Sequence, residues 1–193
     1  MAGSELVAPV LLLAMPQIVD PFFRKSVVLL LAHEEEGSFG FIVNRRTELR
    51  ICDVLRDLGL DWGGDPELPA RFGGPVQPQV GSVLFARGGT EPDLPEASEV
   101  CPGIRVTQNL SELARLAGHP PARLHLLLGY AGWGPGQLVG EILRNDWLTA
   151  PVDAGLIFAE GTEETWERAL RGVGVDPTAL PTWTASEDEG AAN

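Results

Sequence analysis

The glycine-rich string at residues 129–137 (GYAGWGPGQ) is the clearest candidate for binding chemistry in this sequence. It is expected to connect a buried strand to a helix. Glycines placed there would expose backbone N–H groups at the helix N-terminus, where the helix dipole favours an anion. The string matches neither a phosphate-binding loop ending in Lys-Ser/Thr nor the GxGxxG pattern. The interpretation that we favour is a sharp turn that needs glycine so that Trp133 can pack, and a ligand or partner site is the alternative.

A second glycine motif occupies residues 72–76 (FGGPV). Two glycines before a proline permit a close approach of two backbones or a positive φ angle. A bulge or turn at the end of a strand is the favoured interpretation.

The three histidines, His33, His119 and His125, show no metal-ligand spacing such as HxxxH or HExxH. His125 falls inside a buried strand pattern and is expected to be a hydrogen-bonded core side chain. A Ser-His-Asp or Cys-His arrangement stays open, because such residues meet in space and not in sequence. The sequence has no GxSxG elbow on which to build one.

Two carboxylates stand out as polar groups near these motifs. Asp20 precedes Pro21 and is expected to cap a turn, with Arg24 or Lys25 as a natural ion-pair partner. Glu141 and Asn145 lie four residues apart on a predicted helix. They would share one face of it and could line a common groove.

Four stretches together resemble the YqgE/AlgH family of bacterial proteins. They are residues 11–45 (LLLAMPQIVDPFFRKSVVLLLAHEEEGSFGFIVNR), 72–76 (FGGPV), 128–138 (LGYAGWGPGQL) and 145–148 (NDWL). The stretches occur in the family's order and span most of the chain. The resemblance implies an α+β fold with a mixed, partly barrel-like sheet, and a bacterial cytosolic protein. It implies no established activity, because the family's label as a regulator of alginate or transcription names no biochemical step.

The resemblance also supplies the candidate ligand- or partner-binding positions. They are Asp20, His33, Asn44, Gly73, Gly74, Pro75, Gly129, Tyr130, Gly132, Trp133, Gly136, Gln137 and Glu141, and the motifs match at Gly40 and Trp147 as well. At two positions the chain departs from the family. Phe85 stands where relatives usually have histidine, and Val139 stands where they usually have glutamate. Chemistry that depended on those polar residues would be missing here.

Hydrophobic patterning predicts the elements that must position these residues. Strands are expected at residues 6–15, 26–33, 40–44, 71–76, 82–86, 100–107, 123–130 and 155–159. Four helices are expected. The first runs from Ile51 and ends at Gly59, and the second follows Asn109 as its cap and has Leu110 on its apolar face. The third begins at Pro135, and the last follows Thr162 as its cap. Strands and helices interleave irregularly with at least one hairpin, which favours an α+β domain with a mixed sheet.

Composition narrows the domain organisation and the partners. The 193 residues favour one domain over residues 1–183, followed by a disordered acidic tail at 184–193. The net charge of −13 argues against direct nucleic-acid binding. The apolar run at 6–15 is too short to cross a membrane and has no signal-peptide features, so we expect a cytoplasmic protein. Cys52 and Cys101 are expected to be reduced thiols that form no disulfide.

We therefore expect a non-enzymatic regulatory or binding protein with an unknown protein or small-molecule partner and no cofactor or metal. The glycine loops 73–75 and 129–136 would meet at one edge of the sheet, with Asp20, Asn44, Gln137 and Glu141 lining the shared surface. The alternatives are an enzyme, such as a hydrolase or a thiol-dependent protein, and an assembly factor that acts through exposed aromatic residues.

Overall fold

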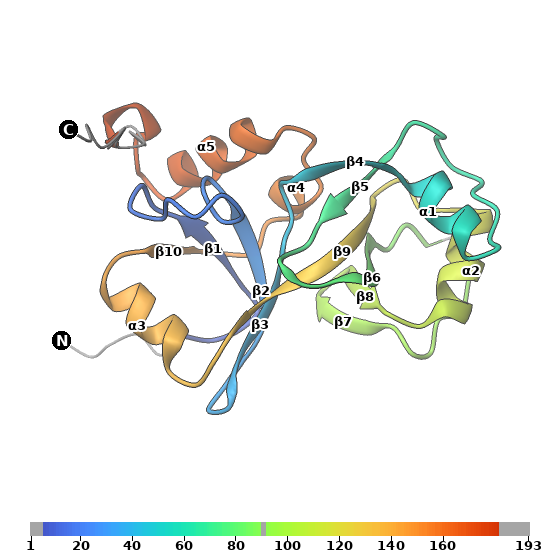
Figure 1. The fold of residues 1–193 in the computed structure, drawn as a ribbon, viewed down its shortest axis with the longest axis horizontal. Coiled ribbons are helices and arrows are strands. Elements are labelled where there is room, and N and C mark those ends of the chain that lie inside the picture. Colours follow the sequence, from blue (N-terminus) through green and yellow to red (C-terminus); the bar gives the residue numbers. More distant parts are fainter. Residues whose placement is uncertain (1–5, 90–91, 182–193) are drawn as a thin grey trace, which may run out of the picture.

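A curled, half-open β-sheet with helices packed around it forms the body of the molecule (Figure 1). The computed structural model describes residues 6–89 and 92–181. The strands are β1 Val10–Ala14, β2 Val27–Glu34, β3 Gly37–Ile42, β4 Arg46–Arg50, β5 Pro69–Phe72, β6 Val76–Ala86, β7 Ser98–Cys101, β8 Ile104–Thr107, β9 Leu124–Trp133 and β10 Trp147–Ala150. The α-helices are α1 Ile51–Asp57, α2 Leu110–Gly118, α3 Gln137–Leu143, α4 Ala154–Ile157 and α5 Thr162–Gly172, and a 3₁₀ turn follows at Pro177–Ala179.

The main path of the sheet runs in the order β10-β1-β2-β3-β9-β6-β8-β7, and β5 joins it through β9. Every pair among the described strands is antiparallel except β5 with β9, which is parallel. The expected α+β domain with a mixed, partly barrel-like sheet is confirmed.

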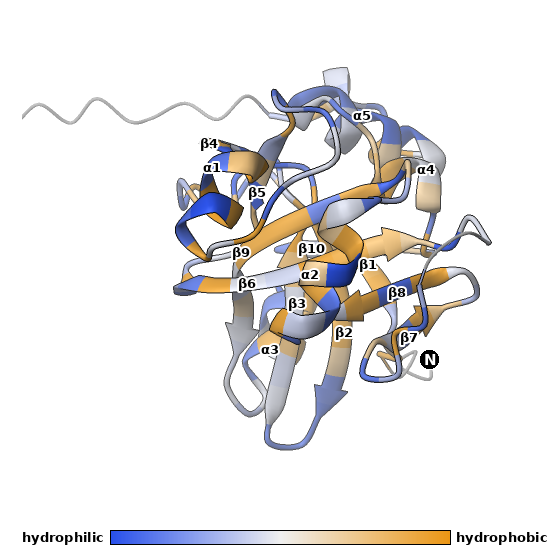
Figure 2. Ribbon diagram, turned by 90° about the vertical axis from the view of Figure 1, so that its right-hand side faces the viewer, coloured by the Kyte–Doolittle hydropathy of each residue, from blue (hydrophilic) through white to orange (hydrophobic). Residues whose placement is uncertain are grey.

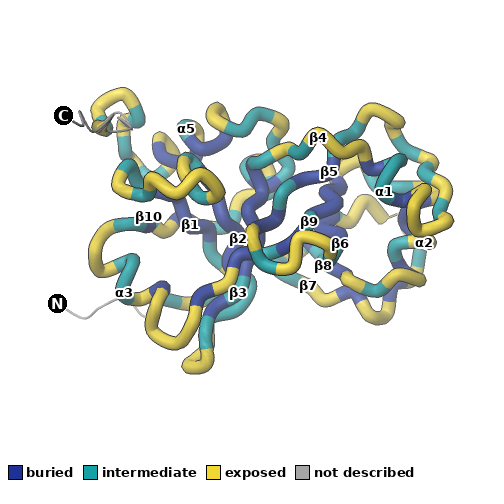
Figure 3. Tube along the Cα trace, in the orientation of Figure 1, coloured by how far each residue is buried: buried dark blue, intermediate teal, exposed yellow. Residues whose placement is uncertain are grey.

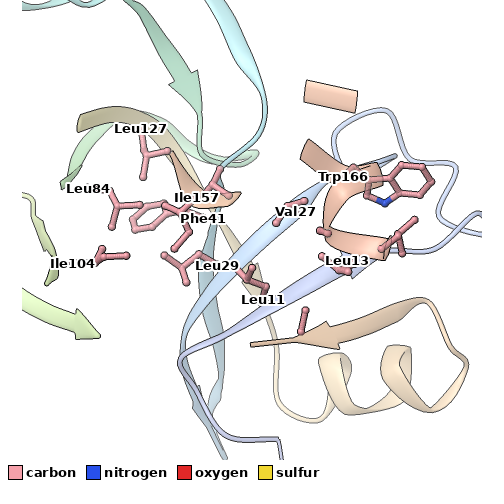
Figure 4. Packing of buried hydrophobic residues seen from close by; sticks show 14 residues of the cluster. Leu11, Leu13, Val27, Leu29, Phe41, Leu84, Ile104, Leu127, Ile157 and Trp166 are labelled. Carbon is pink, nitrogen blue, oxygen red and sulfur yellow. The ribbon is translucent and has the colours of Figure 1, made fainter. Parts of the chain in front are cut away.

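The continuous apolar run of β2 is explained by burial on both of its faces. Val27 and Leu29 pack into a cluster with Phe41 and Trp166 (Figure 4). Val28 and Leu30, which point to the opposite face, belong to a separate cluster. Side chains alternate along a strand, so a strand covered on both faces needs apolar residues at every position.

Strand β9 ties the whole core together. Leu127 lies in the first cluster, Leu126 in a cluster beneath α1 and α2, and Trp133 in the cluster beside α3. The tube in Figure 3 accordingly runs largely dark along β9, between the two halves of the molecule. The end of this strand therefore holds Trp133 on a rigid support.

Helix ends follow capping chemistry only in part. Asn109 caps α2 as expected, because its side chain accepts from the backbone N–H groups of Ser111 and Glu112. Leu110, expected on the buried face, is 53% exposed. The residue that caps α5 is Gly161, and Thr162 is the first helical residue, so the expected Thr162 cap is wrong.

Three expected strands are corrected. Residues 71–76 form the end of β5 and the start of β6, because the chain turns at the glycine pair between them. Residues 100–107 form parts of β7 and β8, a hairpin that turns at Pro102 and Gly103. Residues 155–159 are mostly helical, because Asp153 caps α4 by accepting from the Leu156 N–H. Strands β4 and β10 were not anticipated.

Two expectations concern the ends of the chain and membranes. The tail at 184–193 lies outside the described residues, so its expected disorder stays a prediction. Within the ranges that the structure describes, no helix combines the length and the apolar character needed to cross a bilayer.

Candidate functional site

The two glycine motifs pack directly against each other. A Cβ atom at Gly73 would lie 2.3 Å from the Gly129 carbonyl oxygen, and one at Gly74 would lie 2.1 Å from the carbonyl carbon of Tyr130. Gly73, Gly74 and Gly129 are buried, and Pro75 is exposed. Only glycine permits backbones to approach this closely, so these motifs close a junction between β9 and the β5–β6 turn.

The path from β9 into α3 differs from the expected glycine-rich connection. The strand continues to Trp133, and α3 begins at Gln137, so Pro135 is not the first helical residue. Gly136 is the N-cap residue with a φ of 71°, a left-handed conformation suited to glycine. The Gln137 side chain bends back, and its Oε1 accepts from the Gly134 N–H at 3.0 Å.

Glu141 is the most tightly oriented polar group near this turn. Its Oε2 atom accepts hydrogen bonds from the indole Nε1–H groups of Trp133, at 2.9 Å, and Trp147, at 2.8 Å. Its Oε1 atom accepts from the Gln137 amide at 2.9 Å. Hydrogen bonds to a charged acceptor are the stronger kind, so these three donors fix the carboxylate in one orientation.

An aromatic wall surrounds this carboxylate. The centroids of the Trp133 and Trp147 rings lie 5.9 Å apart, and the ring planes are nearly perpendicular at 80°. Phe23 packs against both rings, with centroid distances of 6.2 Å and 5.9 Å. Edge-to-face contacts of this kind stabilise aromatic pairs beyond their buried area, so the wall is rigid.

A surface hollow of about 350 Å³ opens beside Glu141, and we call it the Glu141 hollow. Its walls carry three carboxylates and three aromatic rings, and no lysine, arginine or histidine is among the described residues that line it. The lining residues are Gln17, Ile18, Val19, Asp20, Phe23, Gly132, Trp133, Gln137, Glu141, Asp146 and Trp147. This charge disfavours an anion at the start of α3 and suits a cation.

Asp20 shapes the rim of the Glu141 hollow. Its Oδ1 atom accepts from the backbone N–H groups of Phe22 at 2.8 Å and Phe23 at 3.3 Å, so the expected turn cap is confirmed. The cap holds the backbone that carries the Phe23 ring. Lys25, expected as an ion-pair partner of Asp20, instead pairs with Glu163.

A second hollow of about 470 Å³ adjoins the first, and we call it the hairpin hollow. It lies at the β2–β3 hairpin, and it shares Gly132 and Trp133 with the Glu141 hollow. Its lining residues are Ala32, Glu34, Glu36, Gly37, Ser38, Phe39, Val76, Tyr130, Gly132 and Trp133. His33 lies at its edge, where its Nδ1 atom is 2.7 Å from the Ser38 hydroxyl.

Asn44 does not join either lining, contrary to the expected shared surface. Its side chain is fully buried, and its Oδ1 atom accepts from the Val27 N–H at 2.8 Å. Its amide donates to the carbonyl oxygens of Lys25, at 3.0 Å, and Thr162, at 2.7 Å. Both polar atoms of the Asn44 side chain thus form hydrogen bonds that connect three chain segments.

Sequence analysis missed several residues of the Glu141 hollow. Trp147 and Asp146 belong to the NDWL stretch, which supported the family resemblance but was not assigned to the site. Phe23 was missed because no local pattern connects it to Trp133. Asn145 does not share a helical face with Glu141, because α3 ends at Leu143 and Asn145 has a φ of 61°.

A buried charge lies away from both hollows, and sequence analysis did not anticipate it. The side chain of Arg71 is fully buried, and its Nη2 atom is 3.3 Å from the Glu160 carboxylate. Nearby, the ring nitrogens of His125 lie 3.0 Å and 2.9 Å from the carbonyl oxygens of Leu124 and Ile157, so the expected core histidine is confirmed. Burial, with a smaller contribution from the Arg71 charge, lowers the pKa of His125 from 6.5 to about 4.

Metal and thiol chemistry find little support in the described part of the chain. No group of three or more His, Cys, Asp or Glu side chains is placed there to hold a metal ion. Cys52 and Cys101 are both free thiols. Burial raises the pKa of the Cys101 thiol, which lowers its thiolate fraction and hence its reactivity.

Comparison with known proteins identifies the family. Residues 11–178 match the family model described as AlgH-like (DUF179). The chain belongs to the AlgH-like family. A UPF0301 protein of Myxococcus xanthus is 42% identical over 174 residues, which cover 90% of this chain and 94% of the relative. A UPF0301 protein of Paracoccus denitrificans is 41% identical over 181 residues, covering 88% and 91%.

Two solved structures share the fold of this chain. The solution structure of the AlgH protein from Pseudomonas aeruginosa is similar with a TM-score of 0.73 and 30% identity, covering 94% of this chain and 97% of that one. A crystal structure of a Corynebacterium diphtheriae protein has the same TM-score at 22% identity, covering 89% of each chain, and supports the fold alone.

The two departures from the family pattern occupy different environments. Phe85 is fully buried in the core cluster beneath α1 and α2, so a histidine at this place would face apolar side chains. Val139 is 42% exposed on α3, outside the Glu141 hollow. Neither position contributes to the lining of the two hollows.

Proposed function

We propose that this AlgH-like protein is a non-enzymatic binding protein whose Glu141 hollow captures a positively charged group of its partner, a guanidinium or an ammonium. The orientation of the Glu141 carboxylate by Trp133, Trp147 and Gln137 is the observation that carries the proposal. A carboxylate held by three donors at an open hollow is preorganised, so a cation meets it without a large entropic cost.

The rest of the hollow fits the same ligand chemistry. Asp20 adds negative charge, Asp146 is already paired with Arg144 at 2.7 Å, and Phe23 with the two indoles adds aromatic surface. Cations bind to aromatic rings through the ring quadrupole, and more strongly where water is partly excluded. The net charge of −13 draws cations toward the molecule and repels nucleic acid, so a regulatory effect in the cytoplasm would act through a protein or small-molecule partner.

Hydrolysis is the second candidate function, and one observation favours it. The His33 ring and the Ser38 hydroxyl are within hydrogen-bond reach, as a base and a nucleophile must be. The two residues also face each other across the β2–β3 ladder, so the contact has a structural explanation. Among the described residues, no side chain forms a hydrogen bond with the second ring nitrogen of His33. The pair therefore has no third member of a triad.

The binding proposal is tested with N-acetyl-arginine amide, a probe that carries one guanidinium and no charged terminus. Saturation-transfer NMR titrations should give a Kd on the order of 1 mM for the natural chain, a value typical of one ionic contact supported by aromatic surface. Glu141→Gln should weaken binding about tenfold or more. It keeps the shape and an acceptor oxygen for the indoles, but it removes the charge.

Glu48→Gln is the matched control, because Glu48 is an exposed carboxylate on β4 outside both linings. It should bind the probe as the natural chain does. Equal affinity of the natural chain and Glu141→Gln would refute the proposal. Covalent labelling of Ser38 by a fluorophosphonate, lost in His33→Ala, would instead support the hydrolytic function.

A further inference from the structure

We infer that the partner is an extended basic segment of a polypeptide, which lies across the Glu141 hollow and the hairpin hollow together. This inference rests on the proposed function, because the Glu141 hollow supplies its first contact. It adds the class of partner and a second contact region.

The two hollows meet at the end of β9, one on each face of the strand, because successive side chains of a strand point to opposite faces. Gly132 and Trp133 contribute to the lining of both, and Gly132 is exposed between them. A Cβ atom at Gly132 would sit 3.3 Å from the Tyr130 ring and 3.9 Å from Val76, within the hairpin hollow, whereas the Trp133 ring packs against Phe23 and Trp147 in the Glu141 hollow. Because Gly132 is exposed and has no side chain, an extended chain can pass around this end of β9 from one hollow to the other.

The negative charge of this surface favours a partner that carries several positively charged side chains. Glu34 and Glu36 line the hairpin hollow, and they add two carboxylates to Glu141 and Asp20 of the Glu141 hollow, whose third carboxylate, Asp146, is paired with Arg144. Both are exposed, and neither forms an ion pair with another described residue. Figure 2 shows the strongly hydrophilic end of this hairpin. Among the residues that the structure describes, no lysine, arginine or histidine lines either hollow, so charge complementarity points to a polycation.

The floor of the hairpin hollow selects long, amphipathic side chains. The Phe39 and Tyr130 rings pack at a tilt of 46° with centroids 4.9 Å apart, and Val76 continues the apolar surface. Lysine and arginine cover such a floor with their methylene stems while the charged heads reach the carboxylates at the rim. An extended backbone with basic side chains matches this arrangement over both hollows, whereas anionic lipids and nucleic acids are repelled.

The inference is tested with a fluorescein-labelled eight-residue peptide of alternating arginine and glycine, read by fluorescence anisotropy. It should bind the natural chain at least tenfold more tightly than N-acetyl-arginine amide does, and an analogue with glutamate in place of arginine should not bind. Glu34→Gln with Glu36→Gln should weaken peptide binding about 5- to 10-fold, since exposed charge pairs each contribute a modest amount.

The control is Glu35→Gln with Glu48→Gln. It also removes two negative charges, but at exposed positions outside both linings. It should change peptide affinity less than twofold. Peptide affinity that falls in Glu141→Gln but not in the Glu34/Glu36 variant would overturn the inference and leave the proposed function standing. Affinity unaffected by Glu141→Gln would refute the proposed function itself. Spermine that binds more tightly than the peptide, and needs both hollows, would overturn the inference in favour of a small polyamine.

Discussion

At the scale of single residues, the same kind of sequence evidence led to two different roles. Asn44 and Glu141 are both polar residues at family motif positions. The side chain of Asn44 is buried and bonded to three backbone groups, whereas Glu141 is bonded to side chains at the wall of an open hollow. Asn44 therefore contributes to folding, whereas Glu141 is free to take the recognition role that we propose for it.

Asn44→Ala should lower the free energy of unfolding by about 2–4 kcal/mol. The substitution leaves the Val27 N–H and the carbonyl oxygens of Lys25 and Thr162 without their partner in a buried place, and each unsatisfied group carries a cost. Urea unfolding followed by circular dichroism measures the difference. A loss below about 1 kcal/mol would contradict the structural role assigned to Asn44.

At the scale of elements, Gly73, Gly74 and Gly129 form a close-packed junction between strands. Gly74→Ala should destabilise the protein by more than about 3 kcal/mol or prevent folding, because the added methyl would meet the Tyr130 backbone at 2.1 Å. Gly172→Ala is the control, since no atom lies within 4 Å of its added Cβ at the end of α5. It should be neutral or stabilising. Similar stabilities for the two variants would contradict the close-packed junction.

The sequence predicted those elements whose pattern is set by burial along the chain. Strand β2 and helix α5 are examples, because their apolar residues recur with the period of a strand or a helix. Residues 155–159 were misassigned because an apolar run this short fits either a strand or a helix. The Asp153 side chain caps the segment and stabilises it as a helix. The pairing of Glu141 with Trp133 and Trp147 required the return of β10 beside β1, which no local pattern encodes.

At the scale of the whole molecule, His125 couples stability to pH. Its pKa is about 4 in the folded state, against an ordinary value of 6.5, because burial disfavours the charged ring. Between these values the unfolded chain binds a proton that the folded chain does not. Stability should therefore fall as the pH drops from about 6.5 to 4, by roughly 3 kcal/mol at most, and this contribution should level off below.

Chemical denaturation at several pH values measures this dependence, with His125→Gln as the comparison. The variant has no titrating ring, so its stability should change less across the same range. A variant whose stability falls as steeply as that of the natural chain would show that other groups cause the dependence.

The central claim is that a cation enters the Glu141 hollow, and the indole N–H signals of the tryptophans test it most directly. A ¹H–¹⁵N spectrum recorded while N-acetyl-arginine amide is added should show the Trp133 and Trp147 signals moving with one common affinity, because both indoles are bonded to the same Glu141 oxygen. The signals of Trp62 and Trp166, outside this hollow, should stay in place. Stationary Trp133 and Trp147 signals at saturating probe, or equal movement of the Trp62 and Trp166 signals, would contradict the claim.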